Sequence, residues 1–220
     1  MKTGWDALWT GPEEAPYQIA FDASRRRLWS RDPAQAAREA GGRWDPRTET
    51  ITLPALGTEF AAEYPKGVVR FAGEDRYPLL SLRLILLNYL SAAKELPLSG
   101  RWIRYDEQPG GQVFFPNLRR TVQEPIGRLF DQVGAERMGR AGELFGFRPA
   151  EGKADLVLEG WYTPRVPLRL LFWGGDEEFP GSFQLLFDLS VSQQMHLEDS
   201  AALCGIVGEL LTQGVQAVAR

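Results

Sequence analysis

The residues best suited to chemistry gather in one stretch, residues 171–199. Asp176, Glu177 and Glu178 stand in a row between a Gly-Gly pair and a Phe-Pro-Gly turn, and a hydrophobic run follows them. Carboxylate oxygens are the ligands that Mg²⁺ and Ca²⁺ prefer in proteins. Acids in a turn are also commonly solvated, paired with arginines or bonded to backbone amides. The stretch therefore predicts a candidate site, with a metal ion, an organic ligand and a solvated turn as the alternatives.

The only histidine of the chain lies in the same stretch. An imidazole titrates near neutrality, so His196 would suit an acid–base role. A divalent cation held by Asp176, Glu178 and Asp188 beside it would make a metal-dependent hydrolase or transferase. No Gly-x-Ser-x-Gly elbow supports a serine nucleophile, however, and a histidine at a helix start is more often a partly exposed residue without a chemical role.

Aromatic and basic neighbours complete the candidate site. Trp173 offers a flat apolar surface beside the acids, and Arg165 is one of the nearest basic residues in the sequence. We expect a pocket beside the acidic turn, walled by Trp173, Phe179 and the start of the last helix. The candidate ligand-binding residues are Asp176, Glu177, Glu178, Asp188, His196, Trp173 and Arg165. No residue is assigned a catalytic step, and the sequence leaves open whether a cofactor is bound.

Familiar enzyme signatures do not emerge. Gly174–Phe179 nearly spells the GGDEF signature of diguanylate cyclases, but an extra glutamate shifts Phe179, and the upstream aspartate segments of that family have no counterpart. The Gly-Gly pairs lack the context of a dinucleotide or phosphate-binding loop. Cys204, the only cysteine, excludes an internal disulfide and a cysteine-based zinc or iron–sulfur site within the chain. The sequence thus favours a binding or accessory protein over an enzyme.

Composition and charge indicate an ordinary globular protein. Of 220 residues, 44% are hydrophobic and 25% are charged, which suits a single domain spanning residues 1–220. The net charge of −4 argues against nucleic acid and anionic membrane as partners. The start has no apolar signal segment, and polar residues such as Arg83 and Asn88 interrupt the apolar run Leu79–Leu90. We expect a soluble cytoplasmic protein; its oligomeric state is left open.

Helix signals are clearest in the first half of the chain. A helix over residues 33–40 has signals at both ends, namely Asp32 as N-cap, Pro33 in the first position, Gln35 as capping-box partner and Gly41 as the stop. An earlier helix is expected around residues 5–9. Residues 78–94 predict a helix that is apolar around most of its circumference and therefore buried at the centre of the fold.

Strand patterns surround these helices. Residues 50–71 predict an antiparallel meander, and further strands are expected over residues 154–162, 166–173 and 183–188, the last two paired through the acidic turn. Helices are expected over residues 125–133 and 138–145 and from about residue 198 onward. The predicted fold class is α+β, with antiparallel strand groups packed on helices and one buried central helix.

Three sequence blocks in fixed order resemble a known family. They are residues 84–90, residues 100–111, and residues 164–199 with the Gly-Asp-Glu-Glu-Phe-Pro block. Together they resemble, over about residues 30–215, a bacterial and archaeal family described as domain of unknown function 3786, common in anaerobes and sometimes fused to a corrinoid-type iron–sulfur module. The resemblance implies an accessory role in anaerobic one-carbon, corrinoid or iron–sulfur metabolism, with a corrinoid or iron–sulfur protein as partner. It implies no catalytic residue.

Overall fold

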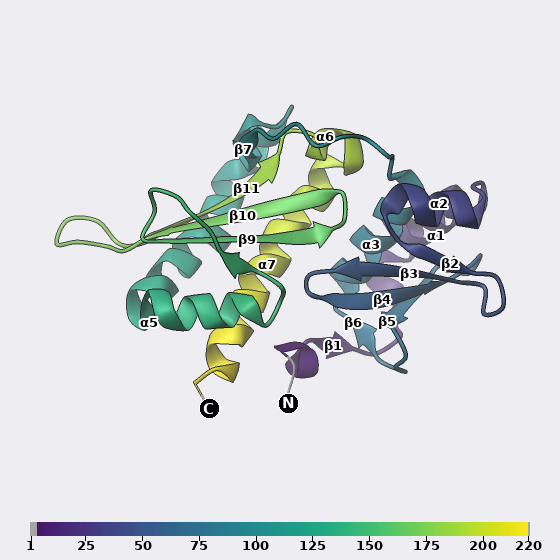
Figure 1. Ribbon diagram of the computed structural model, residues 1–220, viewed down its shortest axis with the longest axis horizontal. Coiled ribbons are helices and arrows are strands. Elements are labelled where there is room, and N and C mark those ends of the chain that lie inside the picture. Colours follow the sequence, from purple (N-terminus) through teal and green to yellow (C-terminus); the bar gives the residue numbers. More distant parts are fainter. Residues whose placement is uncertain (1–3, 220) are drawn as a thin grey trace.

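Two larger antiparallel sheets, of five and four strands, lie side by side in this protein, and a third sheet has two strands (Figure 1). The structure is a computed structural model, and it describes residues 4–219. The α+β class predicted from the sequence is confirmed. Buried apolar residues of the two larger sheets and of the long helices belong to a single hydrophobic cluster.

The N-terminal half forms a four-stranded sheet in the order β2-β3-β4-β5, with every neighbouring pair antiparallel. The meander predicted over residues 50–71 is therefore confirmed. The elements of this half are η1 (Gly4–Ala7), β1 (Trp9–Thr10), η2 (Ala15–Tyr17), α1 (Gln18–Trp29), α2 (Pro33–Ala40), β2 (Arg43–Asp45), β3 (Thr50–Ala55), β4 (Thr58–Glu63), β5 (Val68–Phe71), β6 (Tyr77–Pro78) and α3 (Leu80–Ala92).

The ends of α2 follow the predicted signals. Asp32 Oδ1 accepts a hydrogen bond from the Gln35 backbone N–H at 2.8 Å, Pro33 occupies the first turn, and Gly41 ends the helix at φ 77°. The predicted capping-box return is wrong, because the Gln35 side chain donates to Glu39 at 3.0 Å instead. A local signal thus placed this helix correctly although one of its side chains found a different partner.

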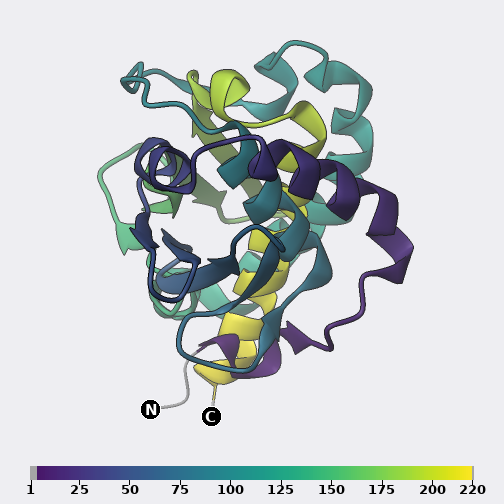
Figure 2. The same ribbon diagram turned by 90° about the vertical axis from the view of Figure 1, so that its right-hand side faces the viewer.

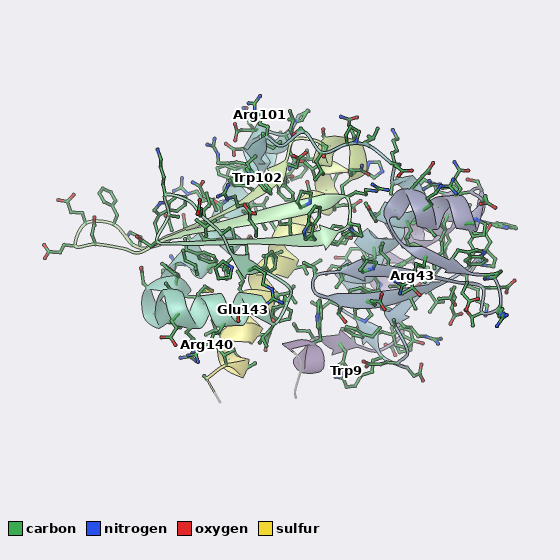
Figure 3. All side chains as sticks on the ribbon, in the orientation of Figure 1. Trp9, Arg43, Arg101, Trp102, Arg140 and Glu143 are labelled. Atoms are coloured by element: carbon green, nitrogen blue, oxygen red, sulfur yellow. The ribbon has the colours of Figure 1, made fainter. Side chains whose placement is uncertain are left out.

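The helix expected around residues 5–9 is not formed. A short 3₁₀ helix, η1, is followed by β1, which pairs with β6. Trp5 is buried with its ring edge-on to Phe60 and Phe145, whereas Trp9 is 53% exposed (Figure 3). Thr10 Oγ1 donates to the Pro78 carbonyl at 3.1 Å and fixes the strand pairing. The glycines and the proline around the segment leave too few residues for a stable α-helix.

The C-terminal half forms a five-stranded sheet in the order β7-β11-β10-β9-β8. The predicted antiparallel pairing through the acidic turn is confirmed, with Trp173 opposite Ser182 at its base. The elements are β7 (Trp102–Arg104), η3 (Tyr105–Glu107), η4 (Gly111–Val113), α4 (Phe115–Leu118), the π-helix η5 (Arg119–Gln123), α5 (Glu124–Glu143), β8 (Arg148–Pro149), β9 (Leu156–Thr163), β10 (Val166–Trp173), β11 (Ser182–Asp188), α6 (Val191–Gln194) and α7 (Leu197–Ala217).

Helices α3 and α7 occupy the centre of the molecule, as expected for α3. They pack on each other, and α1 covers α3 (Figure 2). Helix α5 packs on α7. The polar interruption of α3 by Arg83 has a structural purpose, since its guanidinium donates to the carbonyls of Pro12 and Glu13 and lies over the Phe21 ring. Within the described residues, no helix is long and apolar enough to cross a membrane.

The long helix α5 contains the break that its sequence predicted. Separate helices were expected on the two sides of Gly134, and this residue has a non-helical backbone with φ 73° inside the element. The π-helix η5 runs directly into the start of α5.

Cys204 is buried in α7, where burial raises its pKa to about 12, as expected of an unreactive core thiol.

Candidate functional site

The acidic hairpin, residues 174–181, joins β10 to β11 and projects away from the body of the molecule (Figure 1). Asp176 Oδ1 accepts hydrogen bonds from the backbone N–H groups of Phe179 at 2.8 Å and Glu178 at 2.9 Å. These bonds lower the pKa of Asp176. Glu177 and Glu178 are exposed and form no ion pair within the described residues, and Phe179 is 67% exposed. The three acids therefore stand in solvent.

Two other aspartates hold the base of the hairpin. Asp131, on α5, accepts from the Gly175 N–H at 2.7 Å and from the Gly181 N–H at 2.6 Å. Asp155, before β9, accepts from the Gly174 N–H at 2.7 Å. A Cβ atom at Gly181 would collide with the Asp131 carboxylate, so this close approach requires glycine. Neither aspartate carried a local sequence signal, because each meets the hairpin only in the folded chain.

Asp188 and Arg165 lie away from the acidic hairpin. Asp188 is at the other end of β11 and accepts from the backbone N–H groups of Ser99, Gly100 and Ser190. Burial raises the pKa of Asp188, but its hydrogen bonds outweigh burial and hold that pKa below its ordinary value. Arg165, in the β9–β10 turn, pairs with Glu95 at 3.2 Å. Both residues thus have structural partners of their own.

The carboxylates proposed for a divalent cation are not brought together. Asp176 and Glu178 lie in the hairpin. Asp188 lies at the opposite end of β11, and six residues that pair with β10 separate it from the hairpin. Among the described residues, no group of three histidine, cysteine or acidic side chains is placed to hold a metal ion. Trp173, at the end of β10, is partly buried beside the hairpin, as expected. His196 lies elsewhere, in a cavity between helices.

That cavity, the α3–α6–α7 pocket, has a volume of about 330 Å³. It lies where the end of α3, the short helix α6 and the start of α7 meet. Its lining residues are Asn88, Ala92, Lys94, Ser192, Gln193, Gln194, Met195, His196 and Asp199. His196 is the one residue of the predicted site that reaches it, and the predicted wall at the start of the last helix is present here rather than beside the hairpin.

Asp199 is the unusual group of this pocket. The residue is only 8% exposed, and its Oδ1 accepts a hydrogen bond from Asn88 Nδ2 at 2.8 Å. Within the described residues, Asp199 forms no ion pair and no other hydrogen bond through its side chain. Burial raises the pKa of Asp199, although the Asn88 bond and the charges of His196 and Arg27 partly offset this. A buried carboxylate with so few partners is costly to retain.

Asn88 connects Asp199 to helix α1. Its Oδ1 faces Ser24 Oγ, within hydrogen-bonding distance, and accepts from Arg27 Nη2 at 3.1 Å. Because these groups occupy the amide oxygen, the amide nitrogen of Asn88 is turned toward Asp199. The sequence showed Asn88 only as a polar interruption of an apolar helix. Its partners come from α1 and α7, too far along the chain for spacing to indicate them.

Gln194 fixes the shape of the pocket. Its side-chain amide forms two hydrogen bonds with the backbone of Lys94, donating to the carbonyl at 2.9 Å and accepting from the N–H at 3.2 Å. The buried amide thereby joins α6 to the segment that leaves α3. The pocket is therefore preformed, as is usual for small-molecule sites.

His196 also lines a second hollow, of about 340 Å³. It shares Ser192, Met195 and His196 with the first and adds Gln108. Gln108 is buried, and its Nε2 has no hydrogen-bond partner among the described residues. His196 thus lines two hollows, one with a buried acceptor, Asp199, and one with a buried donor, Gln108.

Comparison with known proteins gives one family. Residues 32–209 match the family described as Domain of unknown function (DUF3786). This range contains the acidic hairpin and every residue that lines the α3–α6–α7 pocket. No curated protein and no solved structure matches the chain significantly.

Proposed function

We propose that this protein, a member of the DUF3786 family, is a non-catalytic binding protein that holds a small polar ligand in the α3–α6–α7 pocket. The observation that carries the proposal is Asp199, a buried carboxylate with one side-chain donor that faces the pocket. A ligand N–H, O–H or ammonium group would supply the partner that the protein itself does not.

Helix stability alone does not account for Asp199. A carboxylate in the first turn of a helix interacts favourably with the macrodipole, and the exposed neighbour Glu198 already occupies such a position. An exposed acid gains this interaction without desolvation. Asp199 is instead buried against Asn88, whose orientation is set by Arg27 and Ser24. Supporting hydrogen bonds of this kind are typical of binding sites in which a side chain is preorganised to contact a ligand.

The pocket sets the size of the ligand. Its volume of about 330 Å³ lies at the lower end of the roughly 300–1,000 Å³ that small-molecule sites span. Lys94 and His196 at its margin add a basic side to the acidic one. A small metabolite with a hydrogen-bond donor and an acidic or hydrogen-bond-accepting group therefore fits this pocket best.

The test compares Asp199→Asn with its neighbour Glu198→Gln, which removes the same charge from an exposed side chain. A panel of small amines, amides, amino acids and sugars is screened by thermal shift, and hits are measured by calorimetry. We expect at least one compound to bind the wild type and Glu198→Gln, and Asp199→Asn to bind it at least about tenfold more weakly, the ratio that ~1.4 kcal/mol represents. If no compound binds, or if both variants bind equally well, the proposal fails.

The expected link to anaerobic one-carbon metabolism rests on the family resemblance. An accessory protein that holds a small ligand would fit beside a corrinoid or iron–sulfur protein, and the proposed partner is of this kind. Affinity purification of the tagged protein from its native host, followed by mass spectrometry and metal analysis, tests this part separately. Recovery of neither kind of metalloprotein would remove the partner while leaving the ligand pocket in place.

A further inference from the structure

Strand β11 has an edge that the fold leaves partly open. Its last three residues, Leu186–Asp188, pair with β7, but Ser182–Leu185 have a neighbouring strand only on the β10 side (Figure 1). Trp102, the first residue of β7, marks the covered end of this edge (Figure 3). The open stretch lies between the acidic hairpin and β7.

The open stretch presents backbone groups on the side where no second strand pairs with it. Along an antiparallel strand, successive residues direct their N–H and C=O groups to opposite sides, so about two of these four residues direct theirs away from β10. Within residues 4–219, Ser182–Leu185 have no strand partner other than β10. The sequence Ser-Phe-Gln-Leu also lacks the lysines and prolines that commonly protect exposed edges. This edge is therefore able to accept another strand.

A groove runs beside this edge. The β11 groove has a volume of about 450 Å³ and is lined by Arg119, Gln123, Glu124, Arg128, Pro180, Gly181, Ser182, Phe183 and Gln184. One wall is the start of β11, and the other is the π-helix η5 with the first turns of α5. A groove between a strand edge and a helix is the geometry in which proteins bind extended peptides by strand addition.

The charges of the helical wall indicate what kind of peptide fits. Arg128 is exposed and forms no ion pair within the described residues, whereas Arg119 pairs with Glu124 at 3.1 Å. The wall thus has one net positive charge, carried by a guanidinium that is available for a carboxylate. Pro180 adds apolar surface on the strand side.

We propose that an extended acidic segment of a partner protein binds in the β11 groove and adds a strand in line with β7. Its backbone pairs with Ser182–Leu185, and an acidic side chain reaches Arg128. This inference does not depend on the α3–α6–α7 pocket, because the two sites have no lining residue in common.

The experiment uses the full chain and two fluorescent hexapeptides, one alternating Glu with Val and one alternating Lys with Val. Fluorescence anisotropy measures affinity for the wild type, for Arg128→Glu and for Arg140→Glu. Arg140 is an exposed arginine of the same helix that lies outside the groove and well away from β7 (Figure 3). We expect the acidic peptide to bind the wild type and Arg140→Glu alike, and Arg128→Glu at least about tenfold more weakly, the ratio that ~1.4 kcal/mol represents.

Hydrogen exchange identifies the binding surface. Saturation with the acidic peptide should slow exchange at backbone amides within Ser182–Leu185, most clearly at those directed away from β10. Equal binding of both peptides, no response to Arg128→Glu, or unchanged exchange at these amides would overturn the proposal. So would a concentration-dependent dimer that protects the same amides without peptide, since the occupant would then be a second copy of the chain.

Discussion

The acidic hairpin and the α3–α6–α7 pocket take their acids from the same stretch of sequence and place them in opposite environments. Asp176 is fully solvated, and backbone N–H groups lower its pKa. Asp199 is buried beside Asn88, and burial raises its pKa. The hairpin has the denser charge, but the single buried acid is the one whose charge the fold disfavours. Burial, rather than the number of neighbouring acids, distinguishes the stronger candidate for binding.

The largest effect on stability should come from Asn88→Ala. This change removes the donor to Asp199 and leaves Arg27 and Ser24 without their shared acceptor. We expect a loss of about 3 kcal/mol in the free energy of unfolding, measured with urea, because the buried carboxylate of Asp199 loses its one side-chain donor. Asn117→Ala, on an exposed residue, is the control and should change stability by under about 0.5 kcal/mol. Equal, small losses in both variants would show that the pocket network is not coupled to folding.

Asp131→Ala should have the next largest effect, and a local one. It removes the carboxylate that accepts from Gly175 and Gly181 at the hairpin base. We expect a loss of about 1–2 kcal/mol, together with faster hydrogen exchange at these two amides. Glu136→Ala, an exposed residue of the same helix, should leave both measurements unchanged. Unaltered exchange in Asp131→Ala would mean that the hairpin is held by other contacts.

The pH dependence of stability should separate Asp199 from Asp188. Asp188 has a lowered pKa, so its contribution is present above its ordinary value of 3.8 and is lost as pH falls through the lowered pKa. Asp199 has a raised pKa, so its contribution is present below 3.8 and is lost as pH rises through the raised pKa. Near neutral pH, the wild type should therefore be more stable than Asp188→Asn and less stable than Asp199→Asn.

Urea unfolding at a series of pH values from about 7 to about 3 measures the stability difference between the wild type and each of the two variants. Both stability differences should become smaller as the pH falls, because the carboxyl groups of the wild type become neutral, as the asparagine amides already are. Differences of the same sign near neutral pH would contradict the contrast between the two aspartates.

The smallest effect is expected for Glu178→Gln in the acidic hairpin. An exposed carboxylate without an ion-pair partner should contribute less than about 0.5 kcal/mol to stability. Urea unfolding of this variant beside Asp131→Ala compares a tip acid with a base acid of the same hairpin. A loss of several kcal/mol would reveal a partner for Glu178 and restore the hairpin as the leading candidate site.

Local signals predicted the fold better than the site. The caps of α2, the apolar run of α3 and the β10–β11 hairpin are each encoded within about twenty residues, and each appears in the structure. The pocket depends on Asn88 and Asp199, which are 111 positions apart. Only tertiary packing brings them together, so no spacing rule could pair them. The one usable signal was an asparagine inside a mostly apolar helix.

The position of Asp131 on α5 has a further consequence for binding. Arg128 and Asp131 are three residues apart, so they lie on the same side of one helix. One rigid element thus sets the spacing between the β11 groove and the acidic hairpin. A partner that touches both would meet two preorganised contacts, and its second contact would form at high effective concentration with little further loss of entropy. Affinity for such a partner would then depend on the rigidity of α5 as much as on either contact.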